Sequence, residues 1–267
     1  PNKWLTPLNL NNKEKQMRKA WLIAFTMFAA FFLGETRVFA QNRRVIVIFR
    51  AGTAVMDQNT VLDGFGISAV KIKDLPIING AVWSIAPEIK AALIENPTVK
   101  AVYDDKTVSL ALLPQNKTTV AELPKQILTW NIARIGAPKV WSATQGIGVK
   151  VGIIDSGIGP HPDVRVAGGV SEVDYTKSYA DDYGHGTHVA GIIGARDNIS
   201  GVIGVGPKIQ IYSIKAFNHS GWGYWSDVIA GLEWCVKNQM RVINMSFGGW
   251  SDFAPLHQAI IAVKKAG

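Results

Sequence analysis

Two short runs in the middle of the chain carry side chains that could act in nucleophilic catalysis. The run Val151-Gly-Ile-Ile-Asp155-Ser-Gly places an aspartate at the end of an apolar strand, and the run His185-Gly-Thr-His-Val-Ala-Gly191 places a histidine at the start of a helix. In a nucleophilic triad an aspartate orients a histidine, which takes a proton from a serine. The order of the two runs predicts such a triad, with the serine expected beyond Gly267.

The two side chains taken singly allow other roles. At the carboxyl edge of a parallel sheet, Asp155 could equally bind a ribose, a magnesium ion or a backbone amide. The helix dipole disfavours a charged His185 and a nearby carboxylate favours it, so we expect an imidazole that rests neutral and can accept a proton. A nucleotide-binding α/β protein is the weaker alternative, because no glycine-rich phosphate loop joins this strand to its helix.

Two further residues could be reactive but favour structural roles. His188 lies three residues after His185, whereas zinc-binding helices space their histidines four apart around a glutamate. We therefore expect His188 to be a packed, hydrogen-bonded core residue. Cys235 is the only cysteine, which excludes an intrachain disulfide, and its helical context predicts a small buried hydrophobe.

Hydrophobic patterning predicts two structured segments that position these residues. Residues 43–110 read as βαββαβ, with strands at 44–49, 66–72, 81–85 and 99–103 and helices at 55–62 and 87–95, the order of a small α+β, ferredoxin-like domain. From residue 126 strands alternate with helices, which predicts an α/β domain with a parallel sheet flanked by helices. Its expected strands are 149–154, 209–216 and 242–245, and its expected helices are 185–195, 226–238 and 255–266. Residues 111–125, polar and bounded by prolines, read as a linker.

Residues 1–40 read as a secretory leader. Residues 17–40 combine a basic start, an apolar stretch and a small-residue cleavage signature, which is typical of a signal peptide, and residues 1–16 read as a non-native upstream extension. Of the net charge of +8, half lies in this leader, and no basic stripe remains for nucleic acid. We therefore expect a secreted protein that meets a membrane only during export.

Three runs, in this order and at this spacing, resemble the subtilisin-like serine proteases, the subtilases. They are the two catalytic runs and Val242-Ile-Asn-Met-Ser-Phe-Gly-Gly249. The resemblance covers residues 126–267, the amino-terminal half of that catalytic domain, and residues 43–110 resemble an inhibitor-type propeptide. The family's Gly-Thr-Ser nucleophile motif and its oxyanion asparagine are absent, so we expect a truncated chain that is inactive by itself.

The resemblance implies a role for each matching residue. Asp155 would orient His185, and His185 would relay the serine proton. Ser246, Phe247 and Gly248 would form one wall of a groove for polypeptide substrates. Gly221 and Gly223, with Trp222, Tyr224 and Trp225, would form the other wall, where the aromatic residues either favour apolar substrate side chains or simply pack.

The resemblance also implies a calcium ion and an intramolecular partner. Oxygen atoms of Gln126, Asp163, Arg196, Asn198, Ser200 and Val202 fall on positions that build a calcium site in the family. The propeptide would act as inhibitor and folding chaperone and be removed by processing within the linker. The predicted protein is thus a secreted serine endopeptidase zymogen; the alternative is a pseudoprotease or an inhibitory module that binds proteases.

Overall fold

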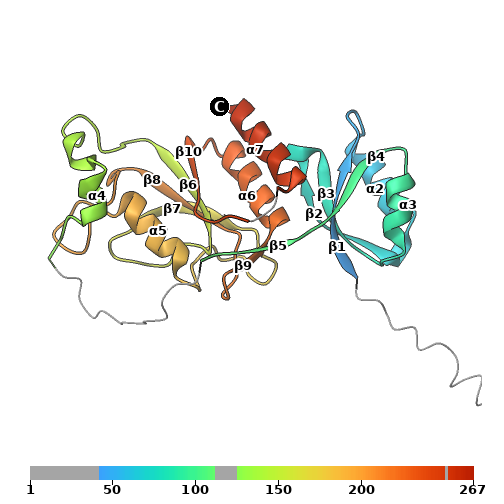
Figure 1. Cartoon of the computed structure of the whole chain (residues 1–267), viewed down its shortest axis with the longest axis horizontal. Coiled ribbons are helices and arrows are strands. Elements are labelled where there is room, and N and C mark those ends of the chain that lie inside the picture. Colours follow the sequence, from blue (N-terminus) through green and yellow to red (C-terminus); the bar gives the residue numbers. More distant parts are fainter. Residues whose placement is uncertain (1–41, 112–124, 250–251) are drawn as a thin grey trace, which may run out of the picture. The chain divides into compact units, whose positions relative to one another are not determined.

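A computed structural model describes residues 42–111, 125–249 and 252–267 (Figure 1). The predicted upstream extension at 1–16, the signal peptide at 17–40 and nearly all of the linker lie outside these residues. Among the described residues, no helix has both the length and the apolar character needed to cross a membrane.

The first segment forms a four-stranded antiparallel sheet with the order β2-β3-β1-β4. Along β1, every second apolar side chain packs beneath the two helices, and the intervening ones join a second core on the other face. Burial on both faces explains why this strand reads as a continuous apolar run rather than an alternating one. Its elements are β1 (Arg43–Phe49), α2 (Val55–Asp63), β2 (Ala69–Leu75), β3 (Gly80–Ile85), α3 (Ile89–Glu95) and β4 (Val99–Asp104).

The predicted βαββαβ order is present, with the clearest differences in position at β2 and α3. Residues Gly66–Ser68 form a 3-10 turn, so β2 begins at Ala69 rather than at Gly66. Helix α3 begins at Ile89, two residues after Pro87, which therefore does not occupy the first helical position.

The second segment contains the predicted parallel sheet flanked by helices, which confirms the α/β fold class. The strand order is β10-β6-β8-β7. In β6, Val151 and Ile153 pack against α5, whereas Ile154 faces the core that contains α6. The elements are α4 (Trp130–Arg134), β6 (Lys150–Asp155), β7 (Val166–Ser171), α5 (His185–Gly194), β8 (Gln210–Lys215), α6 (Trp225–Lys237), β10 (Val242–Met245) and α7 (Ala254–Ala266).

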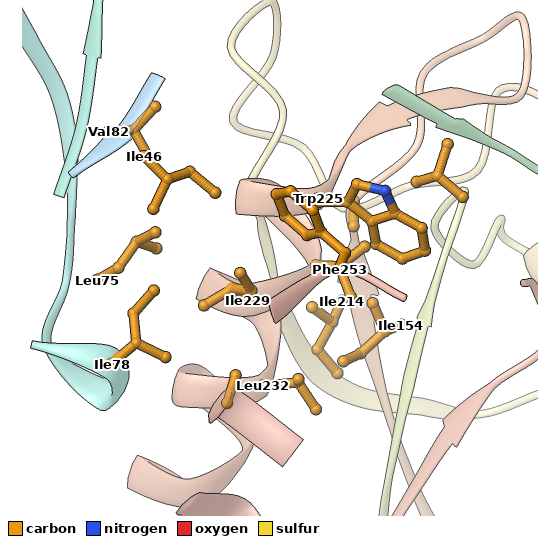
Figure 2. Packing of buried hydrophobic residues seen from close by; sticks show 14 of the residues in the cluster. Ile46, Leu75, Ile78, Val82, Ile154, Ile214, Trp225, Ile229, Leu232 and Phe253 are labelled. Carbon is orange, nitrogen blue, oxygen red and sulfur yellow. The ribbon is translucent and has the colours of Figure 1, made fainter. Parts of the chain in front are cut away.

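The two segments share one hydrophobic core. Figure 2 shows Ile229 and Leu232 of α6 with Ile46, Leu75 and Val82 of the antiparallel sheet, and Ile154 and Ile214 of the parallel sheet belong to the same cluster. Two short strands, β5 (Thr107–Ser109) and β9 (Trp222–Tyr224), also pair antiparallel and join the segments through backbone hydrogen bonds. The first segment therefore covers apolar surface of α6 that water would otherwise contact.

Candidate active site

The Asp155 carboxylate and the His185 ring meet at the carboxyl end of β6. His185 Nδ1 lies 2.8 Å from Asp155 Oδ1 and 2.9 Å from Oδ2, and Asp155 is fully buried. The backbone N–H of Ser156 donates a 2.7 Å hydrogen bond to the same Oδ1. The contact fixes Nδ1 as the nitrogen that faces the carboxylate and leaves Nε2 for another partner.

The contact changes the protonation of His185. The hydrogen bond that His185 Nδ1–H donates to Asp155 raises the pKa of His185 above its ordinary value of 6.5, burial opposes this rise, and the charges of Asp155 and Asp181 reinforce it. The carboxylate therefore outweighs the two influences that disfavour imidazolium, burial and the helix dipole, and His185 is a stronger proton acceptor than a free histidine. The sequence predicted that the opposing influences on the His185 pKa would roughly balance; in the structure the carboxylate dominates.

Asp181 joins the start of α5 to the end of β6. Its Oδ1 accepts hydrogen bonds from the Ser156 hydroxyl at 2.8 Å and from the backbone N–H of Gly184 at 2.8 Å, and its Oδ2 accepts from the backbone N–H of Thr187 at 2.9 Å. Burial alone would raise the pKa of Asp181, but hydrogen bonds from Gly184, Thr187 and the Tyr183 backbone lower it below its usual value. Sequence reasoning did not identify this role, because Asp181 lies three residues before the N-cap Gly184 and so outside the position where a capping aspartate is expected.

Two glycines permit the close approach of helix and strand. Gly184 precedes α5 with φ of 107°, a conformation that favours glycine. At Gly186, an added Cβ would lie 2.0 Å from the carbonyl oxygen of Gly157 and 3.1 Å from Asp155 Oδ1. Glycine at these two positions therefore lets α5 begin close to β6.

Replacing Gly186 with alanine should separate the Asp155–His185 pair. The new methyl group has no space, so α5 must move away from β6, and we expect a loss of about 1–3 kcal/mol in the free energy of unfolding. The pKa of His185, followed by NMR titration, should fall together with stability. Gly191→Ala is the matched control, because an added Cβ at Gly191 meets nothing within 4 Å. Unchanged His185 titration in Gly186→Ala would contradict the prediction.

The chain's own residues occupy one wall of the predicted groove. Strand β5 pairs with β9 so that Val108 lies opposite Gly223, and the backbone N–H of Leu110 donates to the Gly221 carbonyl at 2.8 Å. Val108 and Leu110 are buried, whereas the residues between and beside them are exposed. The Tyr183 hydroxyl, two residues before His185, donates to the Ala111 carbonyl at 3.3 Å. This segment therefore runs toward the candidate active site as an extended peptide.

The second predicted wall follows β10. Ser246 and Gly248 are exposed, and the Ser246 hydroxyl accepts a 2.9 Å hydrogen bond from the Asn244 side chain. The Phe247 ring packs 4.8 Å from Phe217 and 6.3 Å from Trp225. Within the described residues, only the wall around β9 forms a ladder with β5.

The aromatic residues beside Gly223 divide between packing and exposure. Trp225 is buried and stacks 6.1 Å from Phe253, and Tyr224 lies under the Arg44 guanidinium, 4.2 Å from its ring centroid. Trp222 is 51% exposed. Trp225 thus supports the fold, and Trp222 is the aromatic side chain left accessible at this wall.

The residues predicted to hold calcium gather around Asp163, which is almost fully buried. Asp163 accepts hydrogen bonds from the Asn198 amide at 2.9 Å and from the Val202 backbone N–H at 2.8 Å. The Gln126 amide nitrogen donates to the carbonyls of Arg196 at 2.7 Å and Val202 at 3.4 Å. The backbone N–H of Ser200 donates to the Asn198 side chain at 2.8 Å. The predicted residues therefore gather around Asp163, and their carboxylate, amide and carbonyl oxygens are of the kind that calcium prefers. Across the described ranges, no group of three histidine, cysteine or acidic residues could hold a metal ion; the donors gathered here are mostly carbonyls and amides.

The structure contradicts the predicted burial of His188 and agrees with the predicted burial of Cys235. The prediction that His188 is a packed core residue is wrong, because its side chain is exposed on α5 in the described structure. Cys235 is fully buried, as expected, and burial raises the pKa of its thiol to about 12, so it is not a nucleophile at neutral pH.

The fold and this geometry define a subtilisin-like α/β domain. Residues 146–266 match the model of the Subtilase family, and the chain belongs to this family of serine proteases. The chain is 35% identical over 254 residues to the minor extracellular protease Epr of Bacillus subtilis, a match that covers 92% of this chain and 38% of that protein. It is 29% identical to a thermostable alkaline protease of Halalkalibacterium halodurans over 92% of this chain and 64% of the relative. It is 46% identical over 137 residues to subtilisin DY of Bacillus licheniformis, covering 51% and 50%. The chain thus spans less than two thirds of the length of each of these relatives.

Proposed function

We propose that this chain supplies the aspartate and the histidine of a secreted serine endopeptidase zymogen. The observation that carries the proposal is the buried Asp155 carboxylate hydrogen-bonded to His185 Nδ1 at 2.8 Å. The family match and the chain order support a serine nucleophile in the part of the relatives that this chain does not span. The chain by itself would then be inactive.

In this mechanism His185 is the general base. Asp155 holds the ring with Nδ1 facing inward, so Nε2 takes the proton of the serine hydroxyl and returns it to the leaving amine of the peptide. Asp155 also stabilises the imidazolium that forms between these two steps, which agrees with the raised pKa of His185. The substrate would add as a strand to the walls around Gly223 and Phe247 through backbone hydrogen bonds.

We infer that residues 43–111 act as an intramolecular inhibitor. Their last strand, β5, pairs with β9 where a substrate strand would bind, and Leu110 donates to Gly221. Because one strand edge accepts one partner, the β5–β9 pairing would exclude substrate until this segment is removed. The leader-like sequence before residue 41 and the extracellular protease among the relatives support secretion.

The experiment is hydrolysis of casein and self-processing by a protein in which this chain is continued by the serine-bearing part. His185→Ala should abolish both, while His188→Ala, on the exposed side of the same helix, should retain both. Undiminished activity of His185→Ala would overturn the assigned base. If the continued protein has another residue in place of the serine and never cleaves casein, the chain is instead part of a protease-binding pseudoprotease.

We propose calcium as a structural ion at the cluster around Asp163, held by side-chain oxygens of Gln126 and Asn198 and by nearby carbonyls. Calcium at 100 times its Kd should then raise the free energy of unfolding by about 2.7 kcal/mol. Asp163→Asn should abolish this gain, and Asp197→Asn, an exposed aspartate in the same loop, should keep it. Urea unfolding with calcium or with a chelator measures both. An equal calcium effect in the two variants would contradict the site.

A further inference from the structure

Lys215, the last residue of β8, is a charged side chain that the mechanism above does not use. Its relative exposure is 0%. A lysine is almost never fully buried unless its ammonium is paired, because an unpaired buried charge is very costly. Its Nζ lies 2.6 Å from the Ser156 carbonyl oxygen and 2.6 Å from Asp182 Oδ1. Because burying this ammonium is costly, we ask what its two contacts do for the neighbouring residues.

The first partner of Lys215 belongs to the turn that holds the catalytic carboxylate. In the β6–β8 ladder Lys215 lies opposite Asp155, and the next residue, Ala216, donates its N–H to the Asp155 carbonyl at 2.9 Å. Ser156, whose carbonyl accepts from the ammonium, donates its own N–H to Asp155 Oδ1. Lys215 therefore holds Ser156, and Ser156 in turn holds the Asp155 carboxylate.

The second partner belongs to the loop that delivers His185. Asp182 follows Asp181, whose carboxylate ties the start of α5 to the Ser156 hydroxyl. The other Asp182 oxygen accepts the hydroxyl of Tyr175, and the Lys215 ammonium lies 5.8 Å from the centre of the Tyr175 ring. One ammonium thus joins the turn after the aspartate to the loop before the histidine.

We propose that Lys215 is a positioning residue that fixes the separation of the Asp155 and His185 elements through Ser156 and Asp182. It acts through these neighbours, and among the described residues it forms no hydrogen bond or ion pair with the His185 ring. The inference rests on the proposed Asp155–His185 couple, which is the property that it would tune.

The test is an NMR titration of the His185 ring in the present chain. Lys215→Met should lower the pKa of His185 by about half a pH unit or more, because a loosened turn lengthens its hydrogen bond to Asp155. The charged groups that face His185 are Asp155 and Asp181, so removal of the more distant lysine charge would by itself raise the pKa. The sign of the shift therefore separates positioning from a plain charge effect.

Lys150→Met is the matched control. Lys150 lies at the opposite end of β6, with its ammonium 3.3 Å from the Asn238 carbonyl and 5.9 Å from the Tyr212 ring centre, so the variant removes a similar interaction on the same sheet. Lys150→Met should lower the free energy of unfolding without changing the pKa of His185. If both lysine variants lower the pKa equally, or if Lys215→Met raises it or leaves it unchanged, the proposal is overturned.

Lys215→Gln keeps the test decisive if Lys215→Met does not fold. It removes the same charge but keeps a polar side chain near Ser156 and Asp182, and it should lower the His185 pKa in the same direction by a smaller amount; no change or a rise would reject the proposal. Asp155→Asn in the same experiment separates the two claims. If Asp155→Asn lowers the pKa and the Lys215 variants do not, only this inference fails; if Asp155→Asn has no effect, the catalytic couple itself fails.

Discussion

Replacing Asp155 with asparagine should slow catalysis severely, second in this chain only to the loss of His185. The rate of peptide hydrolysis by the serine-containing protein should fall by about four orders of magnitude, because a neutral amide cannot stabilise the imidazolium and no longer holds the tautomer with Nε2 free to accept a proton. In the present chain, the pKa of His185 should fall, because the hydrogen bond from His185 to the Asp155 carboxylate is the first cause of its rise.

The pH dependence follows from the direction of this shift. The raised pKa means that protonated His185 stabilises the folded chain fully below the ordinary value of 6.5, and that this stabilisation is lost as the pH rises through the raised value. The rate of hydrolysis has the opposite dependence, since the base must be neutral, and should rise with pH through the same range. Asp197→Asn, at an exposed aspartate that takes no part in the His185 shift, serves as the control. A variant Asp155→Asn that titrates like the parent would refute the assignment.

Replacing Arg44 with methionine should have the largest effect on stability. The Arg44 side chain is 11% exposed and pairs with Asp105 at 2.7 Å and with Asp227 at 3.0 Å. Removing one partner of a buried ion pair leaves an uncompensated charge, which costs about 3–5 kcal/mol in the free energy of unfolding. Asp105 bears most of this cost, because Asp227 keeps a second partner, Lys73, at 2.7 Å.

The same network joins the inhibitor-like segment to α6. Besides Arg44, Asp105 accepts the backbone N–H and the hydroxyl of Ser226 at the start of α6, at 3.1 and 2.6 Å. Loss of Arg44 should therefore also weaken the association of residues 43–111 with the remaining domain. After processing separates the two segments, they should dissociate faster in the Arg44→Met variant than in the parent.

Arg43→Met is the control for Arg44→Met, because Arg43 is the preceding residue and its side chain is exposed. Urea unfolding should place Arg43→Met near the parent. Burial raises the pKa of Asp105, so the penalty of Arg44→Met should shrink as the pH falls and this carboxylate takes up a proton. Equal stability of the two arginine variants at neutral pH would show that the network contributes nothing.

Local signals account for the elements that sequence placed correctly. The apolar run of β6, the helical pattern after His185 and the βαββαβ order of the first segment each reflect side-chain periodicity within a few neighbouring residues. Strand β7 was not predicted because its sequence, VAGGVS, contains two glycines, which weaken any strand signal, and β5 and β9 are only three residues long.

Sequence by itself determined the family, the α/β class and the identity of the candidate couple, because an aspartate after a buried strand and a histidine opening a helix are properties of short runs. Only the tertiary structure decided what surrounds them: that Lys215 joins the two elements, that Asp181 secures the helix, that Arg44 binds carboxylates 61 and 183 positions away, and that His188 faces outward. These contacts depend on strand order and register, which bring distant residues together and which no local pattern encodes.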